Sequence, residues 1–476
     1  MLKKMLCAFL AAFSINTQNY ADQPPKVAVI GAGLGGLTAA YRLNQQGYNV
    51  DVYEARERVG GRVFTVTLNG KIGELGGMNI ADGGEAKHIR QLVSELGLEL
   101  QERTVPLSHQ LFYENQIISA IDLLKEIFKR FDNDPEQLKA KLLELSETSK
   151  NMAEVLDQLF EKDDLLHRIF SVELAAYEGG SVENLSTIYI DTLYYMMLGG
   201  LSSAHKNDED HSIRRVSVKG GNALLAEKLA DKLSNIYFKK ILKSVSQNSN
   251  GQYLLSFEDG EKTEADILIL AIPCSVFNDI EFNNTIPSNT LEAIKNVKYG
   301  ENAKILFPFD EAPRLNIGFF NHRSVSFFNI NLDVLTVYYT GQHSYFNKLN
   351  IKDLFHPEHL MIQSWFGNAC PKCETISYVD DLNYKSYQGI VGYSWPQDSF
   401  AKGSYSYIAC GQEEVLTAYH EVDGELVRSL FEPIDQLYFA GEHASILQDV
   451  PGTMEAACES GERVARMIVK SQNKNK

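Results

Sequence analysis

The sequence is poor in several features that mark particular protein classes. Only six of its 476 residues are cysteine, and 45 Lys and Arg stand against 62 Asp and Glu, so the formal net charge is −17. A shortage of basic residues argues against nucleic-acid binding, which normally needs a cationic face. So few cysteines in so long a chain exclude a small disulfide scaffold. No internal repeat or low-complexity block is present, and the length leaves room for two or three globular units.

Long hydrophobic runs are also missing. Lys3 and Lys4 precede an apolar segment over residues 5–15, which is too short to span a bilayer. A charged segment followed by a short apolar one is typical of a secretory signal. We therefore predict a signal peptide over residues 1–21 and export to the periplasm or the medium, the alternative being a plain hydrophobic tail. No later run is long enough for a membrane span, so we expect none.

The cysteines that remain offer little chemistry. Cys370 and Cys373 have the spacing of half a metal site, but no second pair with ligand spacing exists, so we expect no metal. In an exported protein these two could form a local disulfide. Two loop cysteines without a catalytic role are the simplest interpretation.

The segment from residue 27 to residue 53 follows a strand–turn–helix–strand pattern. Residues 27–30 form a short apolar run, residues 31–36 a glycine-rich turn, residues 37–45 a helical pattern and residues 50–53 a second strand. A continuously apolar strand followed by a helix indicates a parallel sheet covered on both faces.

The rest of the chain mixes helical and strand-like segments. We predict helices over 86–96, about 120–171 and 454–469, strands over 236–238, 253–257, 267–271 and 437–440, and mixed β structure over 305–405. Asp259-Gly260 predicts a hairpin between two of these strands.

These elements predict an α/β protein with a Rossmann-type nucleotide-binding domain, which the motifs below identify as an FAD-binding domain, interleaved with a mixed α+β substrate domain. We assign residues 25–85, 214–300 and 431–476 to the first domain, and 86–213 and 301–430 to the second, with a helical insertion at about 120–171.

The glycine-rich turn carries the first chemical motif. It reads Gly31-Ala32-Gly33-Leu34-Gly35-Gly36, in which the first glycine permits a tight turn, the second admits a pyrophosphate and the third lets helix and strand pack closely. Glu54 ends the second strand, where a carboxylate can accept hydrogen bonds from adenosine ribose hydroxyls and repel a 2′-phosphate. The pattern therefore predicts a dinucleotide site that disfavours NADP.

Further segments separate FAD from NAD. Residues 54–62 (EARERVGGR), 74–78 (ELGGM), 439–442 (FAGE) and 451–457 (PGTMEAA) resemble the flavin-containing amine oxidase family, which includes monoamine, polyamine and L-amino-acid oxidases. The resemblance covers nearly the whole chain after the signal and implies bound FAD. It implies cofactor contacts from Gly31, Gly33, Gly35, Gly36, Glu54, Ala55, Arg56, Gly61, Arg62, Gly76, Gly77, Met78, Ile241, Gly441, Glu442, Thr453 and Met454.

The resemblance also implies particular roles for some of these residues. Arg62 is expected near the pyrophosphate, and Glu442 near the ribityl-phosphate region. The backbone at Met454, at a helix N-terminus, is expected to face flavin N1 and O2 and to stabilise negative charge there. The backbone of Ile241 is expected at the adenine.

Three residues are expected on the substrate side. Lys304 matches the family lysine that holds a water near flavin N5, and Tyr405 matches one wall of an aromatic cage for the amine. Trp395 lies in the segment expected before the open face of the flavin. We take Lys304, Tyr405 and Trp395 as the candidate catalytic residues.

The sequence departs from the family at three places. Ser404 stands where monoamine oxidases carry a cysteine bonded to flavin, so we expect non-covalent FAD. Thr453 replaces the second cage tyrosine, and Asn79 stands where L-amino-acid oxidases place an arginine for the substrate carboxylate. Whether Arg214 or Arg215 substitutes for that arginine stays open.

The sequence thus predicts an exported FAD-dependent amine oxidase that takes a small amine or amino acid, converts it to an imine, and reduces O2 to H2O2. The alternatives are an L-amino-acid oxidase, an enzyme similar to protoporphyrinogen oxidases or desaturases, and a non-catalytic FAD-binding protein. A homodimer is possible, and no nucleic-acid partner is expected.

Overall fold

The computed structural model describes most of the chain. The described residues are 25–80, 85–106, 110–113, 116–132, 134–198, 212–311, 318–319, 321–366, 375–379, 385–448 and 451–474. The predicted signal peptide and the pair Cys370 and Cys373 lie outside them. Among the helices that are described, none is both long and apolar enough to cross a membrane.

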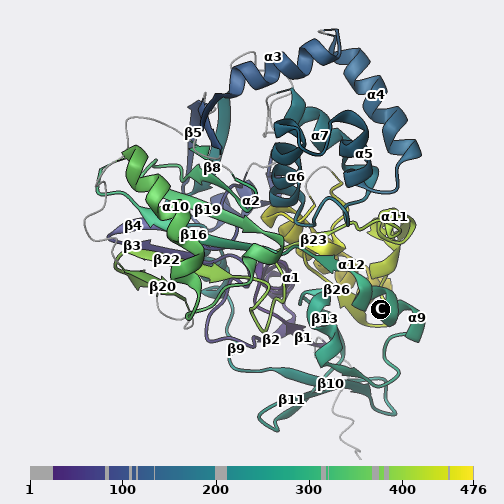
Figure 1. The fold of residues 1–476 in the computed structure, drawn as a ribbon. Helices are drawn as coiled ribbons and strands as arrows, with labels where there is room; N and C mark the ends of the chain where they lie inside the picture. Colours follow the sequence, from purple (N-terminus) through teal and green to yellow (C-terminus); the bar gives the residue numbers. More distant parts are fainter. Residues whose placement is uncertain are drawn as a thin grey trace, which may run out of the picture.

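A parallel five-stranded sheet lies in the lower half of the molecule as drawn in Figure 1. Its order is β26 (Leu437–Phe439), β13 (Ile267–Leu270), β1 (Lys26–Ile30), β2 (Asn49–Tyr53) and β9 (Ile236–Tyr237), and every neighbouring pair is parallel. The strand–turn–helix–strand pattern is confirmed, except that α1 (Leu34–Gln45) begins earlier than expected, with Gly33 as its N-cap.

The last helix, α12 (Met454–Lys474), packs directly on α1. A Cβ atom on Gly461 would lie 2.4 Å from the Gly35 carbonyl oxygen, so the two helices approach more closely than any side chain allows. The Arg42 side chain of α1 also pairs with Glu462 of α12 at 2.8 Å. Segments from the two ends of the described chain therefore build one domain.

The second large sheet has the order β18 (Ser324–Phe328), β19 (Val334–Thr340), β16 (Asn302–Pro308), β22 (Ile390–Ser394) and β20 (Ile376–Tyr378). All neighbours are antiparallel except β22 and β20. One face packs against α10 (Ile351–Phe366), and the other packs near β3 (Thr65–Leu68) and β4 (Lys71–Glu74). Alternate residues of β16 therefore point toward opposite layers.

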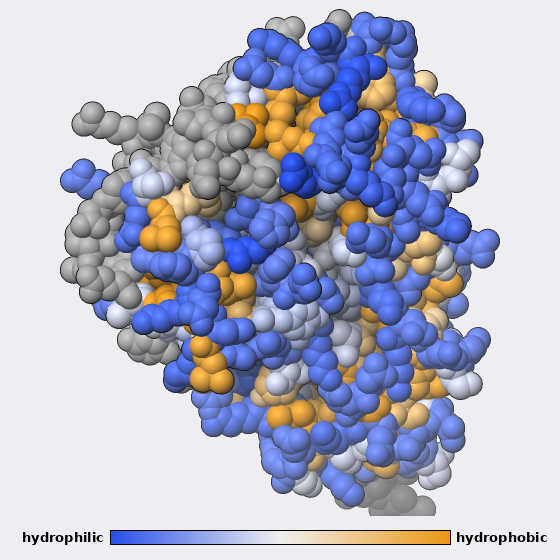
Figure 2. All heavy atoms as spheres, in the orientation of Figure 1, coloured by the Kyte–Doolittle hydropathy of each residue, from blue (hydrophilic) through white to orange (hydrophobic). Residues whose placement is uncertain are grey.

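A group of helices lies above both sheets in Figure 1. It comprises α3 (Ala120–Arg130), α4 (Pro135–Thr148), α5 (Met152–Leu159), α6 (Leu165–Glu178) and α7 (Ile190–Met197). The helical region thus continues beyond residue 171. On the face drawn in Figure 2, hydrophilic side chains predominate and apolar ones form small separate patches.

A four-stranded sheet corrects one expectation. The Asp259-Gly260 turn joins β11 (Tyr253–Phe257) to β12 (Lys262–Ala265), and not to β13, which belongs to the parallel sheet. After this turn the chain forms two short strands, β12 and β13, where the sequence pattern predicted only one. The other members of the sheet are β10 (Leu242–Gln247) and β14 (Glu281–Phe282).

The remaining elements are short or lie between the main layers. They are α2 (Lys87–Glu95), β5 (Leu100–Pro106), β6 (Gln110–Tyr113), β7 (Gln116–Ser119), β8 (Ser212–Val218), α8 (Ala223–Ala230), α9 (Ser288–Asn296), β15 (Lys298–Tyr299), β17 (Gly318–Phe319), β21 (Ser386–Tyr387), β23 (Ser406–Tyr407), α11 (Glu413–Thr417), β24 (Tyr419–Val422) and β25 (Glu425–Arg428). The expected fold class, a Rossmann-type domain interleaved with a mixed α+β part, is confirmed.

Candidate active site

The glycine-rich turn leaves space where a diphosphate would lie. A Cβ atom on Gly36 would lie 2.1 Å from the Gly31 carbonyl oxygen, and Gly31 has φ +105°, so the backbone itself requires glycine at both positions. A Cβ atom on Gly33 would meet no atom within 4 Å. Gly33 is the N-cap of α1, so the open space adjoins a helix N-terminus, which favours anions. The turn therefore fits the expected pyrophosphate.

Glu54 is fixed beside this turn. Its carboxylate accepts hydrogen bonds from the Ala32 N–H at 2.7 Å and the Arg56 N–H at 2.9 Å, and the side chain is buried. Ala55 lies between Glu54 and Arg56 in the chain, and its contact with FAD stays a prediction. A carboxylate has about four acceptor positions, so Glu54 keeps acceptor capacity for ribose hydroxyls.

The Arg56 side chain is held by other side chains of the same protein. Its guanidinium pairs with Asp398 at 2.6 Å and lies over the Phe400 ring at 5.2 Å. Burial alone would raise the pKa of Asp398, but Arg56 lowers it below its ordinary value. Arg56 thus fastens residues 395–400 to the dinucleotide segment, and a direct contact with FAD stays a prediction.

Arg62 and Glu442 form a second buried connection. Arg62 pairs with Glu442 at 2.8 Å and donates to the Ser404 carbonyl oxygen at 2.7 Å, while Glu442 also accepts from the Ser406 hydroxyl at 2.6 Å. Burial opposes ionisation of Glu442, but Arg62 lowers its pKa below the ordinary value. The Gly61 backbone lies against the turn, because a Cβ atom there would lie 3.3 Å from the Gly33 Cα. Gly441 adopts φ +136° just before Glu442.

The second glycine segment meets the start of α12. A Cβ atom on Gly76 would lie 2.0 Å from the Arg62 carbonyl oxygen, and one on Gly77 would lie 3.0 Å from the Met454 side chain. The Thr453 hydroxyl accepts from the Ala456 N–H at 3.2 Å and so caps α12. Gly77 and Met454, both of which are predicted to contact the cofactor, therefore lie side by side at the start of α12.

Lys304 reaches the same segment from the substrate sheet. It lies in the middle of β16, is 6% exposed, and donates to the Gly76 carbonyl oxygen at 2.5 Å and the Glu74 carbonyl oxygen at 3.3 Å. A buried ammonium group is thus held against the backbone where the flavin ring is expected.

Tyr405 and Trp395 occupy different surroundings. The Tyr405 hydroxyl donates to the carbonyl oxygens of Ala176 and Tyr177 at the end of α6, at 2.7 and 2.8 Å. Its ring lies against Gly452, whose Cβ would come within 2.9 Å of it. Trp395 is 3% exposed and donates to the Leu75 carbonyl oxygen at 2.9 Å. Trp395 therefore supports the second glycine segment, and its catalytic role stays a prediction.

Several contributing residues escaped the sequence analysis. Tyr338 of β19 lies directly across from Lys304, with its ring centroid 5.7 Å from the Lys304 Nζ. Tyr299 accepts from the Cys274 N–H at 2.9 Å and contacts His443 Nδ1 at 3.3 Å. Burial lowers the pKa of His443 to about 4, so this histidine is neutral at physiological pH. Aromatic residues in a fully buried strand gave no signal that separates site from core.

The Ile241 backbone is also committed within the protein. Its carbonyl oxygen accepts from the Glu258 N–H at 2.9 Å, which ties this segment to the end of β11. An adenine contact from Ile241 stays a prediction.

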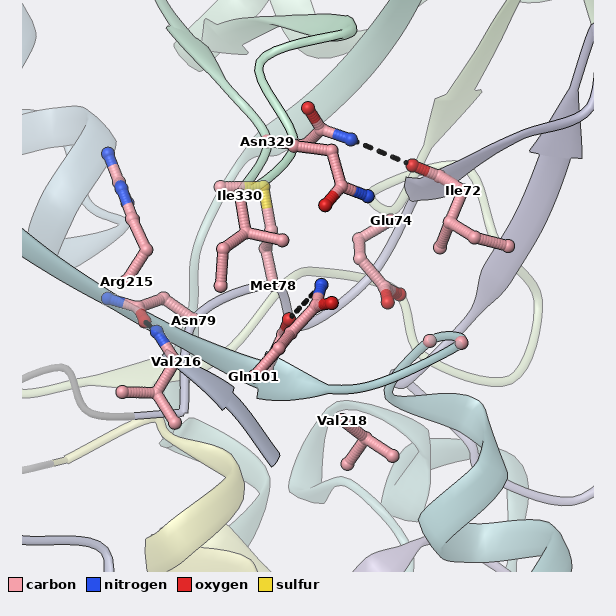
Figure 3. Close-up of a pocket in the computed structure, with 14 residues that line it drawn as sticks. Ile72, Glu74, Met78, Asn79, Gln101, Arg215, Val216, Val218, Asn329 and Ile330 are labelled. Carbon is pink, nitrogen blue, oxygen red and sulfur yellow. Dashed lines mark hydrogen bonds between the residues drawn. The ribbon is translucent and has the colours of Figure 1, made fainter. Parts of the chain in front are cut away.

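A pocket is lined in part by Glu74 and Met78, the two ends of the second glycine segment (Figure 3). Its lining includes Glu74, Met78, Asn79, Arg215 and Asn329. The Asn79 side chain accepts from the Val216 N–H at 2.9 Å, so the residue in place of the family arginine is tied to β8. Burial raises the pKa of Glu74 to about 7. The Arg214 side chain lies outside the described residues.

Known proteins resemble this chain in sequence. Among curated proteins, the chain is 26% identical to lysine-specific histone demethylase 1 homolog 1 of Arabidopsis thaliana, over 94% of this chain and 52% of that protein. It is 23% identical to probable polyamine oxidase 4 of Arabidopsis thaliana (90% and 84%) and 25% identical to L-amino-acid oxidase of Sistrurus catenatus edwardsii (94% and 87%). The chain spans about half the length of the demethylase.

Solved structures agree on the fold. Wild-type putrescine oxidase bound to putrescine matches with a TM-score of 0.67 at 18% identity, over 94% of this chain and 99% of that one. Cyclohexylamine oxidase from Brevibacterium oxydans matches with a TM-score of 0.68 at 18% identity, over 94% and 100%. The profile of flavin-containing amine oxidoreductases matches residues 34–469. The chain therefore belongs to the flavin-containing amine oxidoreductase family, and FAD, for which the turn at Gly33 leaves room, is its cofactor.

Proposed function

We propose that this protein is an amine oxidase that converts a neutral amine to an imine, which water hydrolyses to an aldehyde and ammonia, while O2 is reduced to H2O2. The observation that carries the proposal is the placement of the Lys304 ammonium group against the Gly76 carbonyl oxygen, in the glycine segment that meets the start of α12. Tyr338 stands directly opposite Lys304 on the neighbouring strand. Bound FAD supplies the acceptor for two electrons. The protein supplies orientation and electrostatics.

Each charged residue has a defined part in this proposal. Lys304 presents an ammonium group at the reacting edge of the site, where it can hold a water molecule and favour a neutral amine over a protonated one. The N-terminus of α12 stabilises negative charge that develops at the cofactor. Arg62, held by Glu442, places a cation next to the pyrophosphate turn.

Non-covalent attachment of FAD is part of the proposal. Ser404 carries no thiol, and its hydroxyl donates to the Asn302 side chain at 2.7 Å. Acid or urea denaturation should therefore release free yellow flavin. Flavin absorbance that stays with the precipitated protein would contradict non-covalent binding.

The substrate class is tested by screening the FAD-loaded protein. Peroxide release should be measured with monoamines, diamines, polyamines and L-amino acids, and flavin bleaching should be followed anaerobically in parallel. We expect at least one amine to bleach the flavin and to yield one peroxide per aldehyde. Activity confined to L-amino acids would favour the amino-acid oxidase alternative. A flavin that no amine or amino acid bleaches would favour a desaturase-like enzyme or a non-catalytic FAD-binding protein.

We also propose that the protein is exported, which rests on the charged and apolar pattern of residues 3–15. Fractionation of expressing cells should find the protein outside the cytoplasm. A variant in which Leu10 is replaced by Arg should stay inside. Cytoplasmic wild-type protein of full length would contradict export.

A further inference from the structure

Each of the five backbone carbonyl groups of the second glycine segment, residues 74–78, accepts a hydrogen bond from a side chain. The Lys304 ammonium group donates to the first and the third of them, and the Trp395 indole N–H donates to the second at 2.9 Å. The Asn222 amide donates to the last two, at 3.1 and 2.8 Å. Three side chains from distant parts of the chain therefore hold the segment along its whole length.

The backbone N–H groups of the segment are also paired within the protein. The Leu75 and Gly76 N–H groups donate to the Phe64 carbonyl oxygen at 2.9 and 3.3 Å. The Gly77 N–H donates to the Arg62 carbonyl oxygen at 3.1 Å. A backbone whose polar groups are paired in this way needs no ligand to satisfy them. The protein itself thus sets the shape of the surface that is expected beside the flavin ring.

The Asn222 side chain uses both ends of its amide in this arrangement. It is 1% exposed, and its Oδ1 accepts from the Val218 N–H at 2.9 Å. One neighbouring donor and two neighbouring acceptors define the orientation of the amide. Asn222 is also the N-cap residue of α8, but its side chain makes no capping hydrogen bond. Helix capping therefore does not explain the asparagine at this position.

The chain approaches the glycine segment through a turn that requires glycine. Gly221 has φ +116°, and a Cβ atom there would lie 2.3 Å from the Thr65 Cγ2. The Asn222 backbone N–H donates to the Glu74 carboxyl at 2.8 Å, and the Thr65 hydroxyl donates to the same carboxyl at 2.8 Å. Gly221 lines the pocket of Figure 3 together with Glu74 and Met78. The backbone at Gly221 and Asn222 is thus fixed against the glycine segment.

The three side chains divide the segment into two parts. Lys304 and Trp395 bind its first three carbonyl oxygens, whereas among the described residues Asn222 is the one side chain that binds the last two. Gly77, the first of these two residues, also lies against Met454 at the start of α12. Loss of the Asn222 amide should therefore loosen the end of the segment that adjoins the α12 N-terminus.

We propose that Asn222 is a positioning residue for the flavin, because its amide holds the end of the glycine segment in the shape that receives the ring. Asn222 acts through the backbone of Gly77 and Met78, so it needs no contact of its own with FAD. The inference rests on FAD as the cofactor and not on the proposed amine oxidase activity. No local pattern could show this role, since 144 residues separate Asn222 from Met78.

Two variants of the FAD-loaded protein, Asn222→Ser and Asn222→Asp, test this role. Serine and aspartate are both favoured at a helix N-cap, so α8 should form, but neither side chain can donate to both carbonyl oxygens. We expect the Kd for FAD to rise about tenfold in each variant, because two hydrogen bonds to the segment are lost. Flavin fluorescence after dilution measures the release of FAD. The visible circular dichroism of the flavin that stays bound should also change, because the ring would lie against a displaced backbone.

Asn44 provides the matched control. It lies on α1, its side chain is exposed, and its amide donates to the Lys232 carbonyl oxygen at 3.3 Å. Asn44→Ser and Asn44→Asp therefore remove an amide-to-carbonyl hydrogen bond far from the glycine segment in sequence. Both measurements should be unchanged in these two variants.

Urea denaturation separates a positioning role from a purely structural one. Asn222 variants that unfold at lower urea, but keep the wild-type Kd for FAD and the wild-type circular dichroism of the flavin, overturn the inference. Weaker FAD binding in Asn222→Asp alone also overturns it, because the added charge would then be the cause. If Asn222→Asp does not fold, the neutral variant Asn222→Ser decides alone. A wild-type protein that binds FAD but oxidises no amine would overturn the proposed function and leave the role of Asn222 standing.

Discussion

Within the glycine-rich turn, two glycines are required by the fold itself, and a third is required by the cofactor. Gly31 and Gly36 have no room for a side chain because the protein's own backbone lies within 2.6 Å of the position that a Cβ would take. Gly33 has φ −76°, which any residue can adopt, and open space beside it. A glycine that neither conformation nor packing demands is explained by the ligand that fills this space.

We therefore expect Gly33→Val to abolish FAD binding while the protein still folds. The valine side chain would occupy the position of the pyrophosphate without meeting protein atoms. Flavin absorbance of the purified variant, together with circular dichroism, checks this. Gly36→Val is the matched comparison and should fail to fold, because its side chain would enter the Gly31 carbonyl. Full flavin absorbance in Gly33→Val would disprove the assignment of the turn.

Lys304 illustrates a residue whose role is chemical. Lys304→Met keeps a side chain of similar volume in β16 and removes the ammonium group, so FAD should stay bound. We expect flavin reduction or reoxidation to slow about tenfold or more, because a fixed charge at the reacting edge is lost. Stopped-flow absorbance measures both half-reactions. Lys298→Met, at an exposed site on β15, is the control, and normal turnover by Lys304→Met would refute the assignment.

At the scale of elements, the sequence predicts best where a motif and a periodic pattern coincide. The β1–α1–β2 unit and the β26–α12 unit follow from apolar strands bounded by glycines, since both signals are local. The pairing of Arg56 with Asp398 could not be predicted, because the partners are far apart in sequence and meet only through tertiary packing. Tyr338 was missed for a related reason: β19 is buried throughout, so no alternation marks its site-facing residues.

The Arg56–Asp398 pair connects two elements and gives a stability prediction. Asp398 also accepts hydrogen bonds from the Tyr393 hydroxyl of β22 and, at 2.8 Å, from the Phe400 N–H. Asp398→Asn removes the paired counter-charge of the buried Arg56 guanidinium, which should cost about 3–5 kcal/mol in the free energy of unfolding. Urea denaturation of the FAD-saturated protein measures the loss.

An exposed ion pair provides the control for that measurement. Lys402 and Asp279 are paired at 2.6 Å, but both side chains are more than a third exposed. Asp279→Asn should therefore cost less than about 1 kcal/mol. Equal effects of Asp279→Asn and Asp398→Asn would show that burial does not set the strength of the Arg56 contact.

The whole molecule is built from layers that enclose ionisable groups deep in its interior. The helices above the two sheets bury Glu178 at the end of α6, where it is 7% exposed and its carboxyl accepts from the Thr192 hydroxyl at 2.6 Å. Burial raises the pKa of Glu178 to about 7, from an ordinary value of 4.5. The same effect acts on Glu74 below the site. The stability of the fold therefore depends on pH through these two buried carboxyl groups.

The sign of this linkage follows from proton uptake. Between pH 4.5 and 7 the folded protein holds the Glu178 proton and the unfolded chain has released it, so this carboxyl makes the fold less stable as pH rises. Glu178→Gln removes the titration and keeps an acceptor for Thr192. Relative to wild type, the variant should gain stability across this range, by on the order of 2–3 kcal/mol at pH 8, with little difference at pH 4.5. Taking the difference between two proteins cancels the opposite contribution of the buried His443.

Glu99→Gln is the comparison, because Lys219 holds the pKa of that surface carboxyl below its ordinary value, so no gain is expected between pH 5 and 8. Urea denaturation at four pH values gives the curves, and a constant difference between wild type and Glu178→Gln would mean that this carboxyl titrates as if in water.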